Sequence, residues 1–348
     1  MSEVGVTPKG RSRSAALLTA LSLGAAFSVS MPAAAAPAAG PAADIDRHVR
    51  AAEALAKDDL KPAVSFLCSA DQSALVKDGL VNGAKQWLAP TRLFDNIFYI
   101  GSRFVGVLVV KTSDGLILFD SETSAAEVEQ YLLPGLQALG LDPHAIRYVI
   151  VTHGHWDHFG GAAYLQQTFG AHVGLSAADW DMIEHAPPDS PGVSGHPAPR
   201  RDLVLADGQS LTLGDTRITL YVTPGHTPGT VSAIVPGREG GKTYPLSLYG
   251  SFAFPAGVEP TDRYGGLRLY RTSVERFAGI SRAAGAVGVL NTHVFGDGGV
   301  ARLQAAQARG AGQPNPFLIG PAAVARYYAL TDECLQAAEL RLNAAATH

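Results

Sequence analysis

The spacing of apolar residues along the chain changes near residue 90 from a helical period to short, strand-like runs. In the segment 41–85, apolar residues recur at helical spacing among polar ones, which predicts helices. From Phe94 onward, short apolar runs that end in turns predict strands, and amphipathic stretches between them predict helices. The predicted strands are 96–100, 105–110, 116–119, 148–151, 211–213, 217–222, 231–235, 246–249 and 287–290. The predicted helices are 127–139, 162–169, 273–284 and 321–342.

Predicted strands outnumber predicted helices, yet the two kinds of element interleave. This order favours an α/β fold, a layered sandwich with mixed sheets, over a barrel. The chain has 348 residues, of which 47% are apolar and 17% charged, so it can bury a sizeable core. A net charge of −4 and the lack of any run of lysines or arginines argue against a nucleic-acid partner.

Residues 1–36 have the pattern of a secretory signal peptide. Lys9, Arg11 and Arg13 form a basic start, and the apolar stretch 15–29 that follows is too short to span a bilayer comfortably. Small residues then provide an Ala-x-Ala cleavage pattern that ends at Ala36. We therefore expect a periplasmic protein with no membrane contact after cleavage; the alternative is an uncleaved membrane anchor.

The two cysteines, Cys68 and Cys334, lie outside every cluster of metal-ligand residue types. In an oxidising compartment they could pair and tie the N-terminal segment to the C-terminal helix. They could equally be two separate buried thiols, because the sequence does not place their Cα atoms.

Candidate chemistry is concentrated in three stretches that follow predicted strands: Thr-His-Gly-His-Trp-Asp-His at 152–158, Thr-Pro-Gly-His-Thr at 223–227 and Asn-Thr-His at 291–293. Imidazole is the commonest protein ligand for zinc, and a catalytic zinc needs three protein ligands and an open position. Five histidines and one aspartate divide into two such sets, which predicts a two-metal hydrolase. The six candidate ligands are His153, His155, Asp157, His158, His226 and His293.

The order and spacing of these residues resemble the metallo-β-lactamase superfamily, whose signature is His-x-His-x-Asp-His followed by two distant histidines. The resemblance implies an αββα sandwich of two mixed β-sheets flanked by helices. This fold would form a metallo-β-lactamase-like hydrolase domain at 90–348, preceded by an N-terminal helical extension at 37–89. The resemblance also implies two zinc ions per chain at one edge of the two sheets. One zinc would be held by His153, His155 and His226, and the other by Asp157, His158 and His293.

Within that superfamily, Ser251 indicates the subfamily. Many of its hydrolases, including lactonases and glyoxalase II types, place a bridging aspartate at this point, whereas this chain has Leu-Tyr-Gly-Ser at 248–251. A serine there makes the chain most similar to the third subclass of class B metallo-β-lactamases. Ser251 is therefore a candidate to bind a substrate carboxylate, the alternative being a structural role in a turn.

The resemblance implies a periplasmic dinuclear zinc hydrolase that opens the cyclic amide of a β-lactam, and hence a role in antibiotic resistance. Asp157 would be the catalytic residue that orients the attacking hydroxide, and Asp120 would hydrogen-bond the ligand loop from behind. The alternatives are a zinc hydrolase of lactones or other esters and a mononuclear iron dioxygenase of the same fold. The partner is a small-molecule substrate, and the sequence specifies neither its identity nor the oligomeric state.

Overall fold

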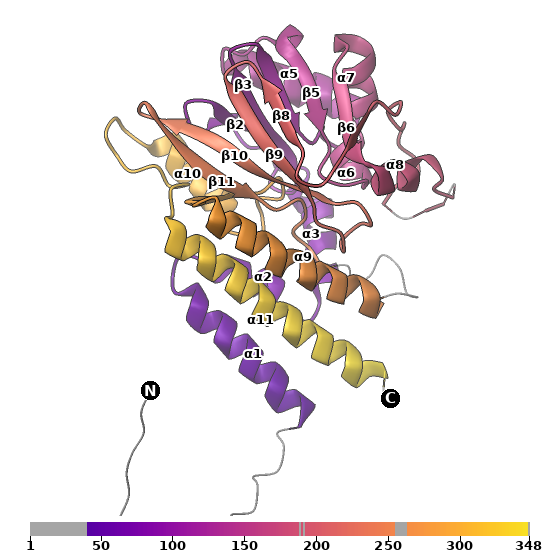
Figure 1. The fold of residues 1–348 in the computed structure, drawn as a ribbon, viewed down its shortest axis with the longest axis vertical. Coiled ribbons are helices and arrows are strands. Elements are labelled where there is room, and N and C mark those ends of the chain that lie inside the picture. The colour runs from indigo at the N-terminus through magenta and orange to yellow at the C-terminus, as the bar shows by residue number, and fades with distance from the viewer. Residues whose placement is uncertain (1–39, 188, 191, 255–262, 347–348) are drawn as a thin grey trace, which may run out of the picture. The chain divides into compact units, whose positions relative to one another are not determined.

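Two β-sheets pack face to face in the part of the chain that the computed structural model describes, residues 40–187, 189–190, 192–254 and 263–346 (Figure 1). The first sheet has the strands β1 (Thr91–Arg92), β2 (Ile97–Gly101), β3 (Gly106–Thr112), β4 (Gly115–Phe119), β5 (Ile146–Ile150), β6 (His172–Ser176) and β7 (Leu203–Leu205), in that spatial order. The second has the order β12 (Gly288–Leu290), β11 (Lys242–Leu248), β10 (Val231–Glu239), β9 (Thr216–Val222) and β8 (Ser210–Leu213). Buried side chains such as Ile117 and Leu220 join the sheets in one apolar cluster.

Both sheets are mixed. The first is antiparallel from β1 to β4 and parallel from β4 to β7, while the second contains one parallel pair, β11 with β12. The carboxyl ends of parallel strands meet at one edge of a sheet. The segments that follow β4 and β5, which carry Asp120 and the 152–158 loop, therefore lie side by side.

Helices cover both outer faces, as an αββα sandwich requires. The first sheet is covered by α4 (Ala125–Glu127), the π-type turn η2 (Val128–Leu132), α5 (Leu133–Ala138), α6 (Trp156–Phe159), α7 (Ala162–Phe169) and α8 (Ala177–Glu184). The short helix η3 (Pro143–Ala145) precedes β5. The second sheet is covered by α9 (Arg263–Ala283) and α11 (Pro321–Ala346), and α10 (Gly299–Ala308) contacts β1. The predicted fold class is confirmed.

The N-terminal segment of the described chain is helical and packs on the C-terminal helix. Helix α1 (Pro41–Ala56) runs beside α11, and α2 (Lys61–Leu67), α3 (Gln72–Asp78) and the π-type turn η1 (Gly79–Gly83) follow (Figure 1). Cys68 and Cys334 form a disulfide that joins the end of α2 to α11. Of the two alternatives that the sequence left open, the structure has the paired one.

The predicted signal peptide lies outside the described residues, and the extension boundary at residue 89 stays a prediction. Among the described residues, no helix is both long and apolar enough to span a bilayer.

Several elements differ from those predicted. The helix predicted at 127–139 is divided into α4, η2 and α5, because Pro134 lacks a backbone N–H and the chain accommodates it with a π-type turn. Helix α9 begins before the predicted Ser273, since its contact with α11 outweighs the weak helix propensity of Gly265 and Gly266. The elements β6, α8, β7 and α10 were not predicted, because their sequences are short and weakly periodic.

Candidate metal centre

The six predicted ligands come together at the edge of the sandwich, on loops that follow three strands. The 152–158 loop follows β5, His226 lies in the turn between β9 and β10, and His293 follows β12. Two hydrogen bonds join the first two of these loops to the sheets: Val231 donates to the Thr152 carbonyl at 2.7 Å, and Thr223 donates to the Thr230 carbonyl at 2.7 Å. The site is therefore anchored on strands of both sheets.

The first ligand group consists of His153, His155 and His226, whose candidate ligand atoms all lie within 4.8 Å of one another. His155 Nδ1 and His226 Nε2 are 3.2 Å apart. His153 Nδ1 donates to the Gly250 carbonyl at 2.9 Å, so its Nε2 carries a lone pair, and that atom is buried without a hydrogen-bond partner. Converging, partly unsatisfied imidazole nitrogens are the donor set that a zinc ion uses.

The second ligand group consists of Asp157, His158 and His293. The Nε2 atoms of the two histidines are 3.0 Å apart, and each is 3.5 Å from Asp157 Oδ2. Because a carbonyl oxygen only accepts, His293 Nδ1 must donate to Phe104, at 2.9 Å. His158 Nδ1 likewise donates to Asp120 Oδ2 at 2.6 Å. Because both Nδ1 atoms donate, the two Nε2 atoms face each other with lone pairs and need a shared proton or a metal ion between them. A metal ion would also bind the Asp157 carboxylate.

The two groups adjoin. The ring centroids of His153 and His158, one from each group, are 3.9 Å apart. The donor set therefore fits two neighbouring metal ions, each with three protein ligands and room for an open position.

Burial and neighbouring charges leave these groups in the protonation states that metal binding needs. Burial and the surrounding imidazoles hold the pKa of His153 well below its ordinary value, and burial lowers the pKa of His155 and of His293 to about 4. Burial would raise the pKa of Asp157, but the imidazoles of His158 and His293 outweigh it, so that pKa is lowered. Burial also holds the pKa of His226 well below its ordinary value, so at neutral pH four of the five histidines are neutral and the aspartate is ionised.

His158 is the exception. Burial lowers its pKa, but the carboxylates of Asp120 and Asp157 outweigh burial and raise it. The negative charge of these carboxylates thus favours a bound cation. A divalent cation with three ligands neutralises more of that negative charge than a proton does.

Asp120 anchors the ligand loop from behind. Its Oδ1 accepts from the Thr152 backbone N–H at 2.7 Å, while its Oδ2 accepts from the Thr152 hydroxyl at 3.1 Å and from His158. The residue is fully buried and has a left-handed backbone, with φ of 66°. A carboxylate in this position fixes both the tautomer and the orientation of the His158 ring.

Asp179 is a second buried carboxylate near the site, and nothing in the sequence marks it. From helix α8 its Oδ2 accepts from the Gly154 N–H at 2.8 Å and from the Thr227 hydroxyl at 2.7 Å. Its Oδ1 accepts from the Gly229 N–H at 2.7 Å. It therefore connects the 152–158 loop to the turn that carries His226. These partners are up to 50 positions away in sequence, so no local motif could reveal the contact.

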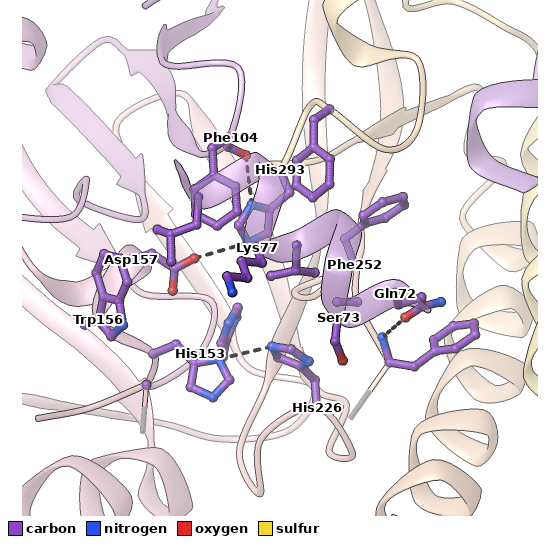
Figure 2. A pocket seen from close by; sticks show the side chains of 17 residues that line it. Gln72, Ser73, Lys77, Phe104, His153, Trp156, Asp157, His226, Phe252 and His293 are labelled. Carbon is purple, nitrogen blue, oxygen red and sulfur yellow. Dashed lines mark hydrogen bonds and ion pairs between the residues drawn. The ribbon is translucent and has the colours of Figure 1, made fainter. Parts of the chain in front are cut away.

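A cleft of about 350 Å³ opens above the two ligand groups (Figure 2). Its floor is formed by the ligands His153, His155, Asp157, His226 and His293. Its walls are formed by Gln72, Ser73, Val76, Lys77, Leu80, Phe104, Trp156, Gly192, Phe252, Ala253, Phe254 and Phe295. The contribution of residues 72–80 was not predicted, because helical periodicity gives no information about which tertiary surface a helix covers.

Ser251 does not line this cleft. It is 5% exposed, and its hydroxyl oxygen is buried without a hydrogen-bond partner among the described residues. Its neighbours Phe252, Ala253 and Phe254 line the cleft instead. A role for Ser251 in binding a substrate carboxylate therefore stays a prediction.

Comparison with known proteins agrees with this fold and site. Residues 101–239 match the family described as "Metallo-beta-lactamase superfamily". Residues 101–239 therefore carry a metallo-β-lactamase domain, in agreement with the two sheets and flanking helices described above.

Two solved metallo-β-lactamase structures share the fold of this chain. BJP-1, a subclass B3 metallo-β-lactamase of Bradyrhizobium japonicum, is 26% identical, with a TM-score of 0.65 over 77% of this chain and 99% of that chain. The FEZ-1 metallo-β-lactamase from Legionella gormanii shares the fold at 23% identity, with a TM-score of 0.61 over 70% of this chain and 92% of that chain.

The curated relatives are hydrolases of other kinds. A hydroxyacylglutathione hydrolase of Acidiphilium cryptum is 36% identical over 24% of this chain and 29% of that protein. The probable metallo-hydrolase YqgX of Bacillus subtilis is 29% identical over 44% of this chain and 69% of that protein. The human acyl-coenzyme A thioesterase MBLAC2 is 27% identical over 42% of this chain and 62% of that protein. The chain thus spans less than a third of the first of these relatives, and more than half of the other two.

Proposed function

We propose that this protein is a periplasmic dinuclear zinc hydrolase that opens the cyclic amide of a β-lactam. The observation that carries the proposal is the composition of the two ligand groups, which contain five histidines and a single carboxylate, Asp157. Ser251 stands where lactonases and glyoxalase II types place a bridging aspartate. The likeness to subclass B3 structures supports the same choice.

His153, His155 and His226 would hold one zinc ion, and Asp157, His158 and His293 the other. Bound there, two zinc ions would lower the pKa of a water molecule and polarise the substrate carbonyl. Asp157 would orient the attacking oxygen and accept its proton at Oδ2, the atom that lies 3.5 Å from both His158 Nε2 and His293 Nε2. Asp120 and the carbonyls of Phe104 and Gly250 would keep three of the imidazoles in place.

The walls of the cleft suit this chemistry. Phe104, Phe252 and Phe295 present apolar surface above the ligand groups, and Phe104 and Phe252 are themselves buried. A bound substrate would displace water from this surface. Exclusion of water strengthens the electrostatic interactions within the site and limits side reactions.

A second candidate is hydrolysis of a thioester or lactone, and the curated relatives favour it, since they include hydroxyacylglutathione hydrolases and acyl-coenzyme A thioesterases. It predicts rapid turnover of S-lactoylglutathione or a homoserine lactone, with little activity on β-lactams.

The two candidates are separated by assaying zinc-loaded protein with nitrocefin, S-lactoylglutathione and a homoserine lactone. We expect nitrocefin to have the highest kcat/KM, and His226→Ala to abolish its turnover. His144→Ala, which removes an exposed histidine that belongs to neither ligand group, is the matched control and should leave turnover unchanged. Brisk thioester or lactone opening without nitrocefin turnover would replace the first candidate with the second.

The periplasmic location is a separate part of the proposal. It is supported by the basic and apolar pattern of residues 1–36 and agrees with the Cys68–Cys334 disulfide, because disulfides persist in oxidising compartments. N-terminal sequencing of periplasmic material should begin at Pro37. An intact N-terminus on soluble protein would contradict the cleavage.

A further inference from the structure

A single cationic side chain, Lys77, faces the metal cleft among its described lining residues. It extends from α3 into the space that His153, Asp157 and His226 also border (Figure 2). The side chain is exposed and forms no ion pair with any residue in the described part of the chain.

Helix α3 is held firmly in this position. Asp71 caps its start by accepting from the Ala74 N–H at 2.9 Å. The buried Gln72 side chain donates to the Leu67 carbonyl at 2.8 Å and accepts from the Phe254 N–H at 3.0 Å, which connects the helix to the wall segment 252–254. The disulfide at Cys68 fixes the residues just before the helix. The backbone that carries Lys77 is therefore positioned by contacts that the lysine itself does not make.

The end of the helix is equally constrained. A Cβ added at Gly79 would lie 2.8 Å from Phe104 Cδ2, so the chain passes directly over the residue whose carbonyl holds His293. The wall formed by residues 72–80 therefore packs directly against a residue that orients one of the candidate ligands.

Most of the lining outside the ligand groups is apolar. Val76 lies on α3 with Lys77, Leu80 lies in η1, and Phe104, Phe252 and Phe295 contribute further apolar surface. A volume of about 350 Å³ is at the small end of the range for ligand pockets. The combination matches a compact ligand with an apolar body, one anionic group, and an electrophilic carbonyl at the floor.

We propose that Lys77 binds the carboxylate of such a substrate and so determines the specificity of the cleft for small, apolar monoanions. The proposal rests on the proposed function for the reaction at the floor, and it assigns to Lys77 the role that the sequence suggested for Ser251. Lys77 forms and breaks no bonds. It holds one end of the substrate while the carbonyl reaches the ligand groups.

The test uses zinc-loaded protein, cephalothin and its uncharged methyl ester, and the variants Lys77→Met and Lys77→Arg. Lys85→Met is the matched control, because it removes an exposed lysine that lies eight positions further along and outside the cleft. An exposed ammonium–carboxylate pair is partly screened, so Lys77→Met should raise KM for cephalothin about tenfold, with kcat within about twofold. KM for the ester should not change. Lys77→Arg should restore most of the affinity, and Lys85→Met should behave like wild type.

A binding measurement separates failure of this inference from failure of the proposed function. Calorimetry with 4-phenylbutyrate and its neutral amide, 4-phenylbutyramide, needs no turnover. We expect wild type to prefer the carboxylate and Lys77→Met to lose about tenfold of that preference, with the effect shrinking at high salt. If cephalothin is not hydrolysed but this loss is seen, the proposed function fails and the role of Lys77 stands. If cephalothin is hydrolysed and neither KM nor the carboxylate preference responds to Lys77→Met, the role of Lys77 is overturned.

Discussion

Three of the candidate ligand histidines are held through the ring nitrogen that faces away from the metal site. His153 donates to the Gly250 carbonyl, His158 to Asp120 and His293 to the Phe104 carbonyl. Each acceptor comes from a different strand end or loop, so the rings are oriented before any metal arrives. Partners of this kind commonly contribute 10- to 100-fold to metal affinity or activity.

Asp157 is the residue whose removal should have the largest effect on catalysis. Asp157→Ala takes away the only carboxylate of the two ligand groups, which would both hold the second zinc and orient the nucleophile. We expect kcat/KM to fall about 10²-fold or more and zinc content to drop to one per chain. Steady-state kinetics with metal analysis checks both. Near-wild-type activity with one zinc bound would rule out the two-metal mechanism.

The buried carboxyl group of Asp179 should make the free energy of unfolding depend on pH. Burial raises its pKa to about 6, although Thr227, Gly154 and Gly229 donate to it. Because the pKa is higher in the folded state than in the unfolded chain, this group stabilises the fold at low pH, and that contribution disappears as pH rises through about 6. The non-titrating Asp179→Asn variant lacks the effect. When the pH is lowered from 7.5 to 4.5, the free energy of unfolding of wild type should rise by about 2 kcal/mol relative to that of the variant.

Urea unfolding of metal-free wild type and Asp179→Asn at both pH values measures that difference, since the other titrating groups are common to both proteins. A free-energy difference that stays constant, or that moves against wild type on acidification, would show that Asp179 is ionised throughout.

The ligand residues could be predicted from the sequence, and the residues that support them could not, for one physical reason. Four ligands fall within six consecutive positions, so their density alone indicates metal chemistry. Asp179 contacts segments far away in the chain, and Lys77 borders a cleft whose other walls come from such segments, whereas a single aspartate or lysine on a helix is ordinarily just a solvated side chain. The resemblance predicts a substrate contact for Ser251, and its burial became visible only in the structure.

At the scale of elements, the strand ends that adjoin the ligand loops were predicted within one residue, because each is the end of a short apolar run at a clear turn. Strand β5 is such a case: it spans Ile146–Ile150, against a prediction of 148–151. Strand β6 was missed because His172 and Gly174 interrupt its apolar pattern. Its burial between β5 and β7 comes from the sheet and not from local propensity.

The Cys68–Cys334 disulfide should contribute measurably to the free energy of unfolding. It closes a span of 266 residues and connects α2, and through it the cleft wall on α3, to α11. Cys68→Ala with Cys334→Ala should lower the free energy of unfolding by about 2–5 kcal/mol. Chemical denaturation of the double variant and of wild type with and without a reductant checks this. Titration of two free thiols in wild type under non-reducing, unfolding conditions would show that the bond is not formed.

At the scale of the whole molecule, the αββα sandwich matters because it places loops from both sheets at one edge. The interleaved order of strands and helices predicted a layered sandwich with mixed sheets, and the resemblance to the metallo-β-lactamase superfamily implied the αββα arrangement. Neither predicted that the N-terminal helices would reach the same edge, since their packing on α11 depends on buried faces that the sequence pattern does not pair. The cleft is therefore a product of the whole described chain, with a floor from the sandwich and one wall from the N-terminal helices.

The most direct test of this account is zinc titration of metal-depleted protein, with nitrocefin hydrolysis and bound zinc measured at each step. Two groups of three ligands at adjoining positions predict that hydrolysis rises until two equivalents of zinc are bound per chain and then stays constant. A plateau at one equivalent would contradict the account. So would activity that returns only with iron and consumes oxygen.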